Sequence, residues 1–314
     1  MRHVEVQGVK VSVIGLGAWQ FGAQGWDYGD DYIDRESRLI VEKALDLGVN
    51  LIDTAEAYGR GRSEEVLSAA LKDRRSEVFL ATKVFPNEPL DADEVVRRAR
   101  ASAERLGVDR IDLYQQHWPS DQAPLDQVMA GMARLQAEGL ITHVGVSNFS
   151  TELWREAEGA LGGPVLSNQV RFSLVSRHPE QRLIPRAEAD GRIVIAYSPL
   201  GQGFLSGRYD GSNTPPDLRQ NNPLFRPEVV AKASVLTSAL AEVAGRHGAT
   251  PAQIALAWVI ARPNVVAIPG ASSVEQMASN AEAADIQLTA DEDARLSEVA
   301  DAFVAEAGDD LARR

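Results

Sequence analysis

The sequence contains no cysteine and only five histidines among its 314 residues. The absence of cysteine excludes disulfides, thiolate nucleophiles and cysteine metal sites, and it fits a reducing compartment such as the cytosol. Basic residues are also in deficit, because 32 Lys and Arg face 45 Asp and Glu and leave a formal net charge of −13. A chain with this charge repels polyanions on average. We therefore expect neither a nucleic-acid partner nor binding to an anionic membrane surface.

Long apolar runs are absent as well. No segment approaches the ~18 consecutive apolar residues of a membrane span. The N-terminal residues Met1 to Glu5 lack the apolar stretch of a signal peptide. We therefore expect a cytoplasmic protein with no membrane segment, and its oligomeric state stays open.

What the sequence does contain is a regular alternation of short β-branched runs with amphipathic helical patterns. Such alternation predicts an α/β fold with a parallel sheet, and eight units of this kind close into a barrel. Since the composition gives no reason to divide the chain, we predict a single (β/α)8 barrel domain over residues 1–314. The eight expected strands are Val11–Gly17, Leu51–Thr54, Val78–Lys83, Ile111–His117, Thr142–Ser147, Val165–Gln169, Ile193–Tyr197 and Val265–Ile268.

Two segments depart from this alternation. Residues Val4–Val11 alternate around Gln7 and Gly8, which predicts a β-hairpin that plugs the N-terminal mouth of the barrel. Residues Gly201–Pro227 are rich in Gly, Pro, Asn and Arg and show no period, so we expect a long loop after the seventh strand.

Polar residues stand where the predicted strands end. In a barrel of this kind the reactive groups collect at the C-terminal ends of the strands. Each such residue alone is more often a helix cap, a surface group or a core group, but their succession on consecutive strand ends favours a site. Tyr58 joins them, because it lies on the loop that leaves the second strand. The strand-end residues are Asp53, Lys83, His117, Ser147, Asn148, Gln169, Tyr197 and Ser198.

Four of these side chains suit the donation of a proton to a carbonyl oxygen. A free tyrosine has a pKa of ~10, and a nearby ammonium such as that of Lys83 lowers the pKa of Tyr58. Asp53 holds Lys83 charged through an ion pair, and His117 hydrogen-bonds and orients the substrate oxygen. Reduction also needs a hydride donor. With no cysteine and no recognisable set of metal ligands, a nicotinamide cofactor is the natural source.

Five ordered motifs resemble those of the aldo-keto reductases, and the resemblance covers nearly the whole chain. The motifs are Asp53–Gly59, Ala81–Lys83, Ile111–Pro119, Gly145–Phe149 and Tyr197–Gly201. The resemblance implies a TIM barrel and the reversible, NAD(P)H-dependent reduction of an aldehyde or ketone. It also implies that Tyr58 is general acid in reduction and general base in oxidation. The implied catalytic tetrad is Asp53, Tyr58, Lys83 and His117.

The resemblance also implies where the cofactor binds. Ser147, Asn148 and Gln169 would hold the nicotinamide carboxamide, and Tyr197 would stack on its ring. The pyrophosphate would pass along the glycine-containing run after the seventh strand, and the adenosine would lie between Ile268 and Asn280. The full set of expected cofactor contacts is Gly17, Ala18, Asp53, Ser147, Asn148, Gln169, Tyr197, Ser198, Pro199, Leu200, Gly201, Gln202, Gly203, Ile268, Gly270, Ser272, Gln276 and Asn280.

One part of the adenosine site departs from the family pattern. Members of the family commonly carry Lys or Arg there to pair with the 2′-phosphate of NADPH, whereas residues 270–276 contain no positive charge. The lost charge-assisted hydrogen bonds are worth roughly 1.5 to 3 kcal/mol each. NADP(H) is the cofactor that the family implies, and NAD(H) is an alternative. Ser272, Ser273 and the helix start behind them, or Arg208 and Arg219 of the long loop, are other candidates for binding the phosphate.

Several aromatic residues fall on or beside loops that face the C-terminal mouth, which predicts an apolar substrate pocket. Trp19 and Trp118 are the expected substrate contacts, together with Tyr58 and His117. The aromatic residues concerned are Trp19, Trp26, Tyr28, Phe85, Trp118 and Phe149.

Three other interpretations are open. Gly15 and Gly17 suggest the glycine motif of a Rossmann dehydrogenase, but Gln20 stands where that dinucleotide-binding motif needs its third glycine. Lys83 at a strand end is also typical of a Schiff-base aldolase, which borohydride trapping would reveal. The third interpretation is a nicotinamide-sensing subunit with little turnover, which single-turnover hydride transfer would distinguish from an enzyme.

Overall fold

The computed structural model describes residues 1–22, 30–209, 213–215 and 217–312. Eight parallel strands lie side by side in chain order from β3 to β10, as the alternating pattern predicts. Each inner strand pairs with the strands before and after it in the sequence, so that β9 lies between β8 and β10. The strands are β3 (Leu16–Gly17), β4 (Leu51–Asp53), β5 (Phe79–Val84), β6 (Ile111–Gln116), β7 (Ile141–Ser147), β8 (Ser167–Arg171), β9 (Ile193–Tyr197) and β10 (Val265–Ala267).

The sheet closes into a barrel where its last strand meets the chain just before β3. Ala267 of β10 donates a hydrogen bond of 2.8 Å to the Val13 carbonyl and accepts one of 2.7 Å from the Gly15 amide. A parallel bridge between Ile14 and Ala267 lies between these two hydrogen bonds. The predicted α/β barrel is therefore confirmed, with residues 13–17 as the seam that joins its two edges.

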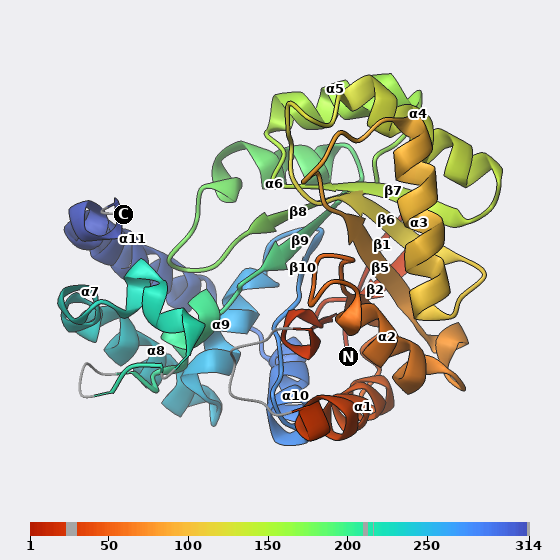
Figure 1. The fold of residues 1–314 in the computed structure, drawn as a ribbon. Helices are drawn as coiled ribbons and strands as arrows, with labels where there is room; N and C mark the ends of the chain where they lie inside the picture. Colours follow the sequence, from red (N-terminus) through yellow and green to blue (C-terminus); the bar gives the residue numbers. More distant parts are fainter. Residues whose placement is uncertain (23–29, 210–212, 216, 313–314) are drawn as a thin grey trace.

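Helices cover the outside of the barrel, and α7, α8 and α11 gather at one side of it (Figure 1). Capping residues set several helix ends: the Asp91 carboxylate accepts from the Glu94 amide at the start of α3, and Gly107 ends α3 at φ +64°. The helices are α1 (Asp30–Asp46), α2 (Arg62–Leu71), α3 (Ala92–Leu106), α4 (Leu125–Ala137), α5 (Thr151–Leu161), α6 (Pro179–Ala189), α7 (Pro227–Lys232), α8 (Ser234–His247), α9 (Pro251–Val259), α10 (Val274–Glu282) and α11 (Ala290–Ala312).

The predicted N-terminal hairpin is confirmed as β1 (His3–Val6) paired with β2 (Val9–Ser12). Gln7 and Gly8 form its turn at φ +51° and +77°, as a two-residue hairpin turn requires. Apolar side chains of the hairpin pack against residues inside the barrel, among them Leu51, Leu113, Ile193 and Val266. Because these belong to the barrel strands, the hairpin fills the N-terminal mouth.

The predicted first barrel strand, Val11–Gly17, was wrong in its first half. Val11 and Ser12 pair with the hairpin, and the barrel strand β3 comprises only Leu16–Gly17. The tight turn fixes the pairing of Val4 with Val11. Strand β1 therefore occupies the antiparallel position beside Val11, where a neighbouring barrel strand would otherwise pair.

The segment Gly201–Pro227, predicted as a long loop, contains short helices in its described part. Its described residues form three 3-10 helices, η3 (Gly201–Ser206), η4 (Leu218–Asn221) and η5 (Pro223–Phe225). The Asp217 carboxylate accepts from the Arg219 amide at the start of η4, and the Asn222 side chain accepts from the Leu224 amide at the start of η5. Local side-chain caps of this kind leave no periodic pattern in the sequence.

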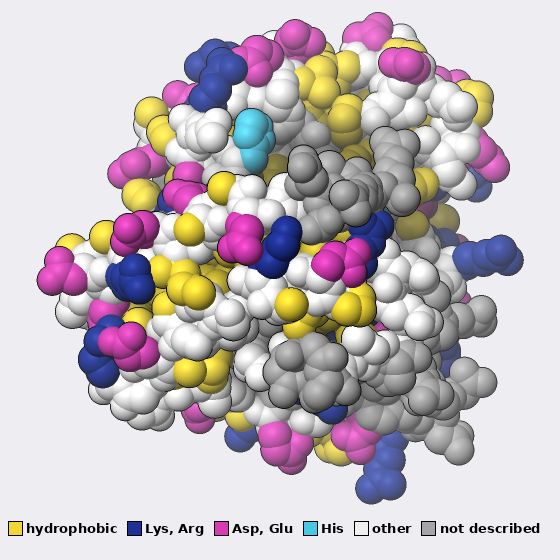
Figure 2. Space-filling model, turned by 90° about the vertical axis from the view of Figure 1, so that its left-hand side faces the viewer, with side chains coloured by type: hydrophobic (Ala, Val, Ile, Leu, Met, Phe, Trp, Pro, Cys, Tyr) yellow, Lys and Arg dark blue, Asp and Glu magenta, His cyan; other side chains and the backbone are white. Residues whose placement is uncertain are grey.

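The surface on the side of α7, α8 and α11 carries acidic and basic side chains interspersed with small apolar areas (Figure 2). Within the described ranges, no helix combines the length and the apolar character that a membrane crossing needs.

Glu292 joins two of the outer helices. Its carboxylate accepts from the Thr289 amide at the start of α11 and lies 2.9 Å from the His247 Nε2 atom and 3.2 Å from the Arg246 Nε atom, both at the end of α8. The hydrogen bonds from His247 and from the Thr289 amide lower the pKa of Glu292 from 4.5 to about 2. The carboxylate form therefore stabilises the contact between α8 and α11.

We predict that Glu292→Gln lowers the melting temperature at neutral pH by about 2–4 °C. A carboxyl group whose pKa is lowered by folding contributes stability above its unfolded pKa and loses that contribution as the pH falls through its folded pKa. The difference between wild type and variant should therefore shrink as the pH falls from 4.5 towards 2. Melting curves at several pH values measure this, and a difference that stays constant over that range would contradict the assignment.

Candidate active site

The ends of the barrel strands bring most of the predicted site residues to one cavity of about 660 Å³. The cavity lies at the C-terminal mouth, where the strands end in polar residues. The predicted residues that line it are Gly17, Trp19, Asp53, Tyr58, His117, Trp118, Ser147, Asn148, Gln169, Tyr197, Ser198, Pro199, Leu200, Gln202, Gly203, Ile268, Gly270, Ser272, Gln276 and Asn280.

Three predicted residues lie behind the wall of this cavity. Lys83 is fully buried beside Asp53. Ala18 is buried, and its amide donates a 2.8 Å hydrogen bond to the Asp53 carbonyl. Gly201, at φ +57°, is buried against Leu224. Lys83 therefore acts on the cavity only through its neighbours.

The buried ammonium of Lys83 uses all three of its hydrogen-bond donors. It donates to the Asp53 carboxylate at 2.6 Å, to the Thr54 carbonyl at 2.8 Å and to the Tyr58 hydroxyl at 3.2 Å. The Asp53 carboxylate also accepts from the Gln169 side chain at 2.8 Å and from the Gln115 side chain at 3.2 Å. The ion pair is thus surrounded by hydrogen bonds, which a buried pair of charges needs.

The pKa values follow from burial and from this ion pair. Burial would lower the pKa of Lys83, but Asp53 and Tyr58 outweigh it and hold that pKa above its ordinary value. Burial raises the pKa of Tyr58, and Lys83 offsets only part of the effect. The expectation that Lys83 leaves the pKa of Tyr58 below that of a free tyrosine was therefore wrong. Tyr58 is a protonated phenol at neutral pH.

His117 lies beside Tyr58, with their rings 5.7 Å apart in an edge-to-face arrangement. The Phe85 ring also packs edge-to-face with His117, at a distance of 5.3 Å between ring centroids. Burial, followed by the charge of Lys83, lowers the pKa of His117 to about 3. Within the described residues its buried Nδ1 atom has no hydrogen-bond partner. The imidazole is therefore neutral at physiological pH.

A chain of hydrogen bonds joins the strand ends on the opposite wall. The Tyr197 hydroxyl donates to the Asn148 side-chain oxygen at 2.9 Å, and the Asn148 side-chain nitrogen donates to the Ser147 hydroxyl at 3.0 Å. Ser147 in turn donates to the Gln169 carbonyl at 2.9 Å. Since the Gln169 amide group donates to Asp53, its side-chain oxygen is left to accept a hydrogen bond from a ligand.

The backbone of this wall is strained at three positions. Asn148, Ser198 and Gln202 have φ angles of +62°, +50° and +61°. A residue other than glycine in this region costs of order 1 kcal/mol, and such residues gather at ligand sites. All three residues line the cavity.

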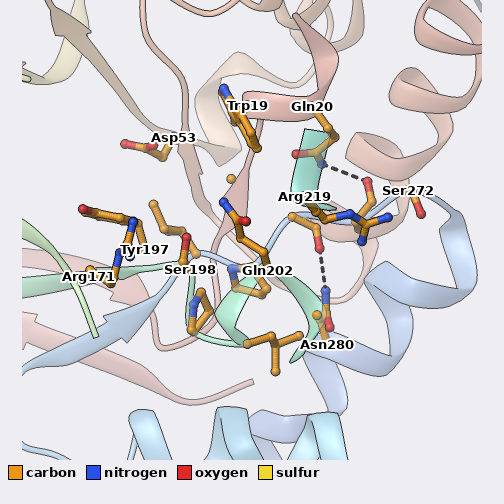
Figure 3. Close-up of a pocket in the computed structure, with 18 of the residues that line it drawn as sticks. Trp19, Gln20, Asp53, Arg171, Tyr197, Ser198, Gln202, Arg219, Ser272 and Asn280 are labelled. Carbon is orange, nitrogen blue, oxygen red and sulfur yellow. Dashed lines mark hydrogen bonds between the residues drawn. The ribbon is translucent and has the colours of Figure 1, made fainter. Parts of the chain in front are cut away.

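The other end of the cavity carries two hydrogen-bond donors that face one acceptor. The Ser272 amide and hydroxyl both donate to one oxygen of Gln276 at 2.8 Å. Asn280 and Gln20 hold this backbone by donating to the carbonyls of Gly270 and Ala271 at 3.2 Å and 2.9 Å (Figure 3). Two donors that converge on one oxygen also suit an oxygen of a phosphate.

The expected aromatic pocket is present in part. Trp19 and Trp118 line the cavity and are 40% and 44% exposed, which is unusual for tryptophan. Phe149 is buried in the hydrophobic core instead. Trp26 and Tyr28 lie outside the described residues.

Sequence reasoning missed several lining residues. Arg171 stands two residues after Gln169, and alternation along a strand predicts that their side chains share one face, so this signal was available. The others lie on loops and helices and leave no comparable pattern. The missed residues are Gln20, Arg171, Ser206, Tyr209, Ala252 and Ser279.

The geometry also bears on the competing interpretations. The strands form a barrel, and after Gly17 the chain enters a single 3-10 turn, η1 (Trp19–Phe21), where a Rossmann fold has a long helix. Lys83 is charged and fully paired, whereas a Schiff-base lysine must be neutral to attack a carbonyl.

Comparison with known protein families gives a match to the Aldo/keto reductase family over residues 13–301. This chain belongs to the aldo-keto reductases. It is therefore an oxidoreductase, and its family implies small carbonyl substrates.

Individual relatives agree with this family. An uncharacterized oxidoreductase of Mycobacterium tuberculosis is 50% identical over 304 residues, which cover 96% of this chain and 94% of the relative. The chloroplastic pyridoxal reductase of Arabidopsis thaliana is 36% identical and is matched over 94% of this chain and 85% of its own length. The crystal structure of an aldo/keto reductase from Klebsiella pneumoniae in complex with NADP and acetate is 33% identical, with a TM-score of 0.78, and covers 95% of this chain and 94% of its own.

We predict that His117 of this aldo-keto reductase does not become protonated between pH 8 and about pH 4, because its pKa is lowered to about 3. Nuclear magnetic resonance of the protein with labelled histidine follows the imidazole signals during a titration. The signal that disappears in His117→Gln identifies the residue. A midpoint near the ordinary value of 6.5 would show that the imidazole is not desolvated.

Proposed function

We propose that this aldo-keto reductase reversibly reduces an aldehyde or ketone to the alcohol, with Tyr58 exchanging a proton with the substrate oxygen. One observation carries the proposal: Tyr58 lines the cavity, and its hydroxyl accepts a 3.2 Å hydrogen bond from the buried Lys83 ammonium. A proton donor that faces a cavity and is backed by a fixed positive charge suits a carbonyl oxygen on which negative charge develops.

Each member of the tetrad has a distinct part in this proposal. Because Lys83 donates to the Tyr58 oxygen, the phenol proton is left for the substrate. In reduction Tyr58 gives this proton to the carbonyl oxygen, and the ammonium stabilises the phenolate that remains. In oxidation the phenolate takes the proton from the alcohol. Asp53 acts through Lys83, whose charge it maintains.

His117 orients the substrate oxygen beside Tyr58. A neutral imidazole carries one proton, and a buried N–H without a partner is more costly than a buried nitrogen acceptor. Since Nδ1 has no partner within the described residues, we assign the proton to Nε2. His117 then donates a hydrogen bond from Nε2 without itself changing charge.

The residues of the cavity fit a nicotinamide dinucleotide, which would supply the hydride when bound. The Gln169 and Asn148 side-chain oxygens are acceptors for the carboxamide, and the half-exposed Tyr197 ring offers a flat face. At Gly17 a Cβ atom would come within 2.8 Å of the Ile268 carbonyl oxygen, so glycine lets these two segments of the cavity lining lie close together. Ala18 and Gly201 remain predicted contacts through their backbone.

We propose NADP(H) as the preferred cofactor. Although residues 270–276 carry no cation, Arg208 and Arg219 line the same cavity from the segment after β9. Asp217 orients the Arg219 guanidinium through hydrogen bonds of 2.6 to 3.1 Å. The NADP complex of the Klebsiella relative supports this choice of cofactor.

We predict that Tyr58→Phe lowers kcat for a benzaldehyde substrate by about 100- to 10,000-fold, the usual contribution of a general acid. The dissociation constant for NADPH should stay within about twofold of wild type, because the ring remains. Steady-state kinetics and fluorescence titration measure the two effects. Near-normal turnover in this variant would reject Tyr58 as the acid, and absence of single-turnover hydride transfer in wild type would favour a sensing subunit.

The pH dependence of reduction follows from the raised pKa of Tyr58. An acid works only while it is protonated, so the rate should be constant through neutral pH and fall only above 10.0, the ordinary pKa of tyrosine. A profile of kcat against pH with saturating cofactor tests this expectation. A decline centred near pH 7 would mean that another group limits the reaction.

We predict that Arg219→Gln raises the dissociation constant for NADPH about tenfold and changes that for NADH much less, because it removes a charge-assisted hydrogen bond. Arg208→Gln, at an exposed position, should act in the same direction without disturbing Asp217. Fluorescence titration with both cofactors gives the ratios. Equal weakening of NADPH and NADH in both variants would show that the two arginines do not contact the 2′-phosphate.

A further inference from the structure

Arg171 is a cation in the cavity that the proposed function does not use. It ends β8 two residues after Gln169, so the two side chains share one face of the strand, about 7 Å apart along it. Gln169 reaches the Asp53 carboxylate of the tetrad at 2.8 Å. The guanidinium of Arg171 lies over the Tyr197 ring, with its Cζ atom 5.9 Å from the ring centroid.

No acidic side chain among the described residues neutralises this guanidinium. Within that part of the chain, Arg171 forms neither an ion pair nor a side-chain hydrogen bond, and the residue is exposed to the cavity. More buried arginines behave differently: Arg186 pairs with Glu158 and Asp190, and Arg262 pairs with Glu180 and Asp293.

Among the described residues, the charges that line the cavity are mostly positive. They belong to Asp53, Arg171, Arg208 and Arg219. Lys83 forms an ion pair with Asp53, and Asp217 forms one with Arg219. Within the described part of the chain, the cavity lining therefore has the opposite sign of charge to the whole protein, whose net charge is −13. Such local charge attracts anionic ligands.

The proposed site of the cofactor's 2′-phosphate does not account for Arg171. Figure 3 shows Arg171 beside Tyr197, at the end of the cavity that holds Asp53, whereas Ser272 and Asn280 lie at the opposite end. Arg219 lies between Gln202 and Ser272 in the same view. Arg171 thus lies in the part of the cavity where the proposed function places the carbonyl.

We propose that the substrates of this enzyme are aldehydes or ketones that carry a negatively charged group, which Arg171 binds. The proposal rests on the proposed function, since it names the substrate class of the same site. A guanidinium binds a carboxylate through charge-assisted, often paired hydrogen bonds. The exposed rings of Trp19 and Trp118 in the same cavity favour an aromatic or otherwise flat body between the carbonyl and the anion.

The test compares two aldehydes with the same skeleton, 4-carboxybenzaldehyde and its neutral methyl ester. Wild type should reduce the carboxylate with the higher kcat/KM, and Arg171→Gln should lower the ratio of the two kcat/KM values about fivefold. That change equals about 1 kcal/mol, as expected for an ion pair in contact with solvent. Arg171→Lys should retain part of the preference, and the preference should weaken at high salt because the charges are screened.

Arg110→Gln is the matched control, because Arg110 is exposed and directly precedes β6, at the opposite end of the barrel. It removes the same charge from the protein and should leave the ratio unchanged. An equal ratio in wild type and Arg171→Gln, or an equal loss with both aldehydes, would overturn the proposal and leave Arg171 as a support for Tyr197.

A binding measurement separates this proposal from the proposed function. Quenching of tryptophan fluorescence by the two aldehydes, with NADP+ present, gives a ratio of dissociation constants that does not depend on turnover. If wild type binds the carboxylate more tightly through Arg171 but reduces neither aldehyde, the proposed function fails and the anion site stands. If both aldehydes are reduced equally and bound equally, the anion site fails and the reductase stands.

Discussion

The buried ion pair between Lys83 and Asp53 is the constraint on which the site depends. Removing one member of such a pair leaves an uncompensated charge and typically costs about 3–5 kcal/mol. The two side chains come from adjacent strands, β5 and β4, so the register of the barrel sets their separation of 2.6 Å. The third donor of the ammonium then fixes the Tyr58 hydroxyl. The register of the barrel strands, the buried ion pair and the position of the Tyr58 hydroxyl therefore depend on one another.

Much of this arrangement could be predicted from the sequence. Alternating strand and helix patterns predict a barrel, and a barrel brings the ends of its strands to one mouth. Polar residues at strand ends such as Asp53, Lys83 and His117 then predict a site without any knowledge of distances. The hairpin around Gln7 and Gly8 was predictable for a similar reason, because its turn residues specify the pairing of the strands on either side.

The features that the sequence did not predict depend either on competing contacts in the folded chain or on single local side-chain caps. Val11–Gly17 has the pattern of one strand, but two partners share it: the hairpin takes its first residues and β10 takes the rest. The pKa of Tyr58 follows from the balance of burial against the charge of Lys83, and burial is a property of the folded chain. The 3-10 helices η4 and η5 each begin at a single capping side chain. None of these leaves a periodic signal.

The strained backbone at Asn148, Ser198 and Gln202 has a consequence for the evolution of the protein. Glycine occupies this conformation without penalty, yet three positions of the cavity wall keep larger side chains there. Asn148 holds the Tyr197 hydroxyl, and Gln202 accepts a hydrogen bond from Asn222. Selection for stability alone would favour glycine at these positions, whereas selection for activity would keep the side chains that are present. Stability and activity thus place opposite demands on the same three residues.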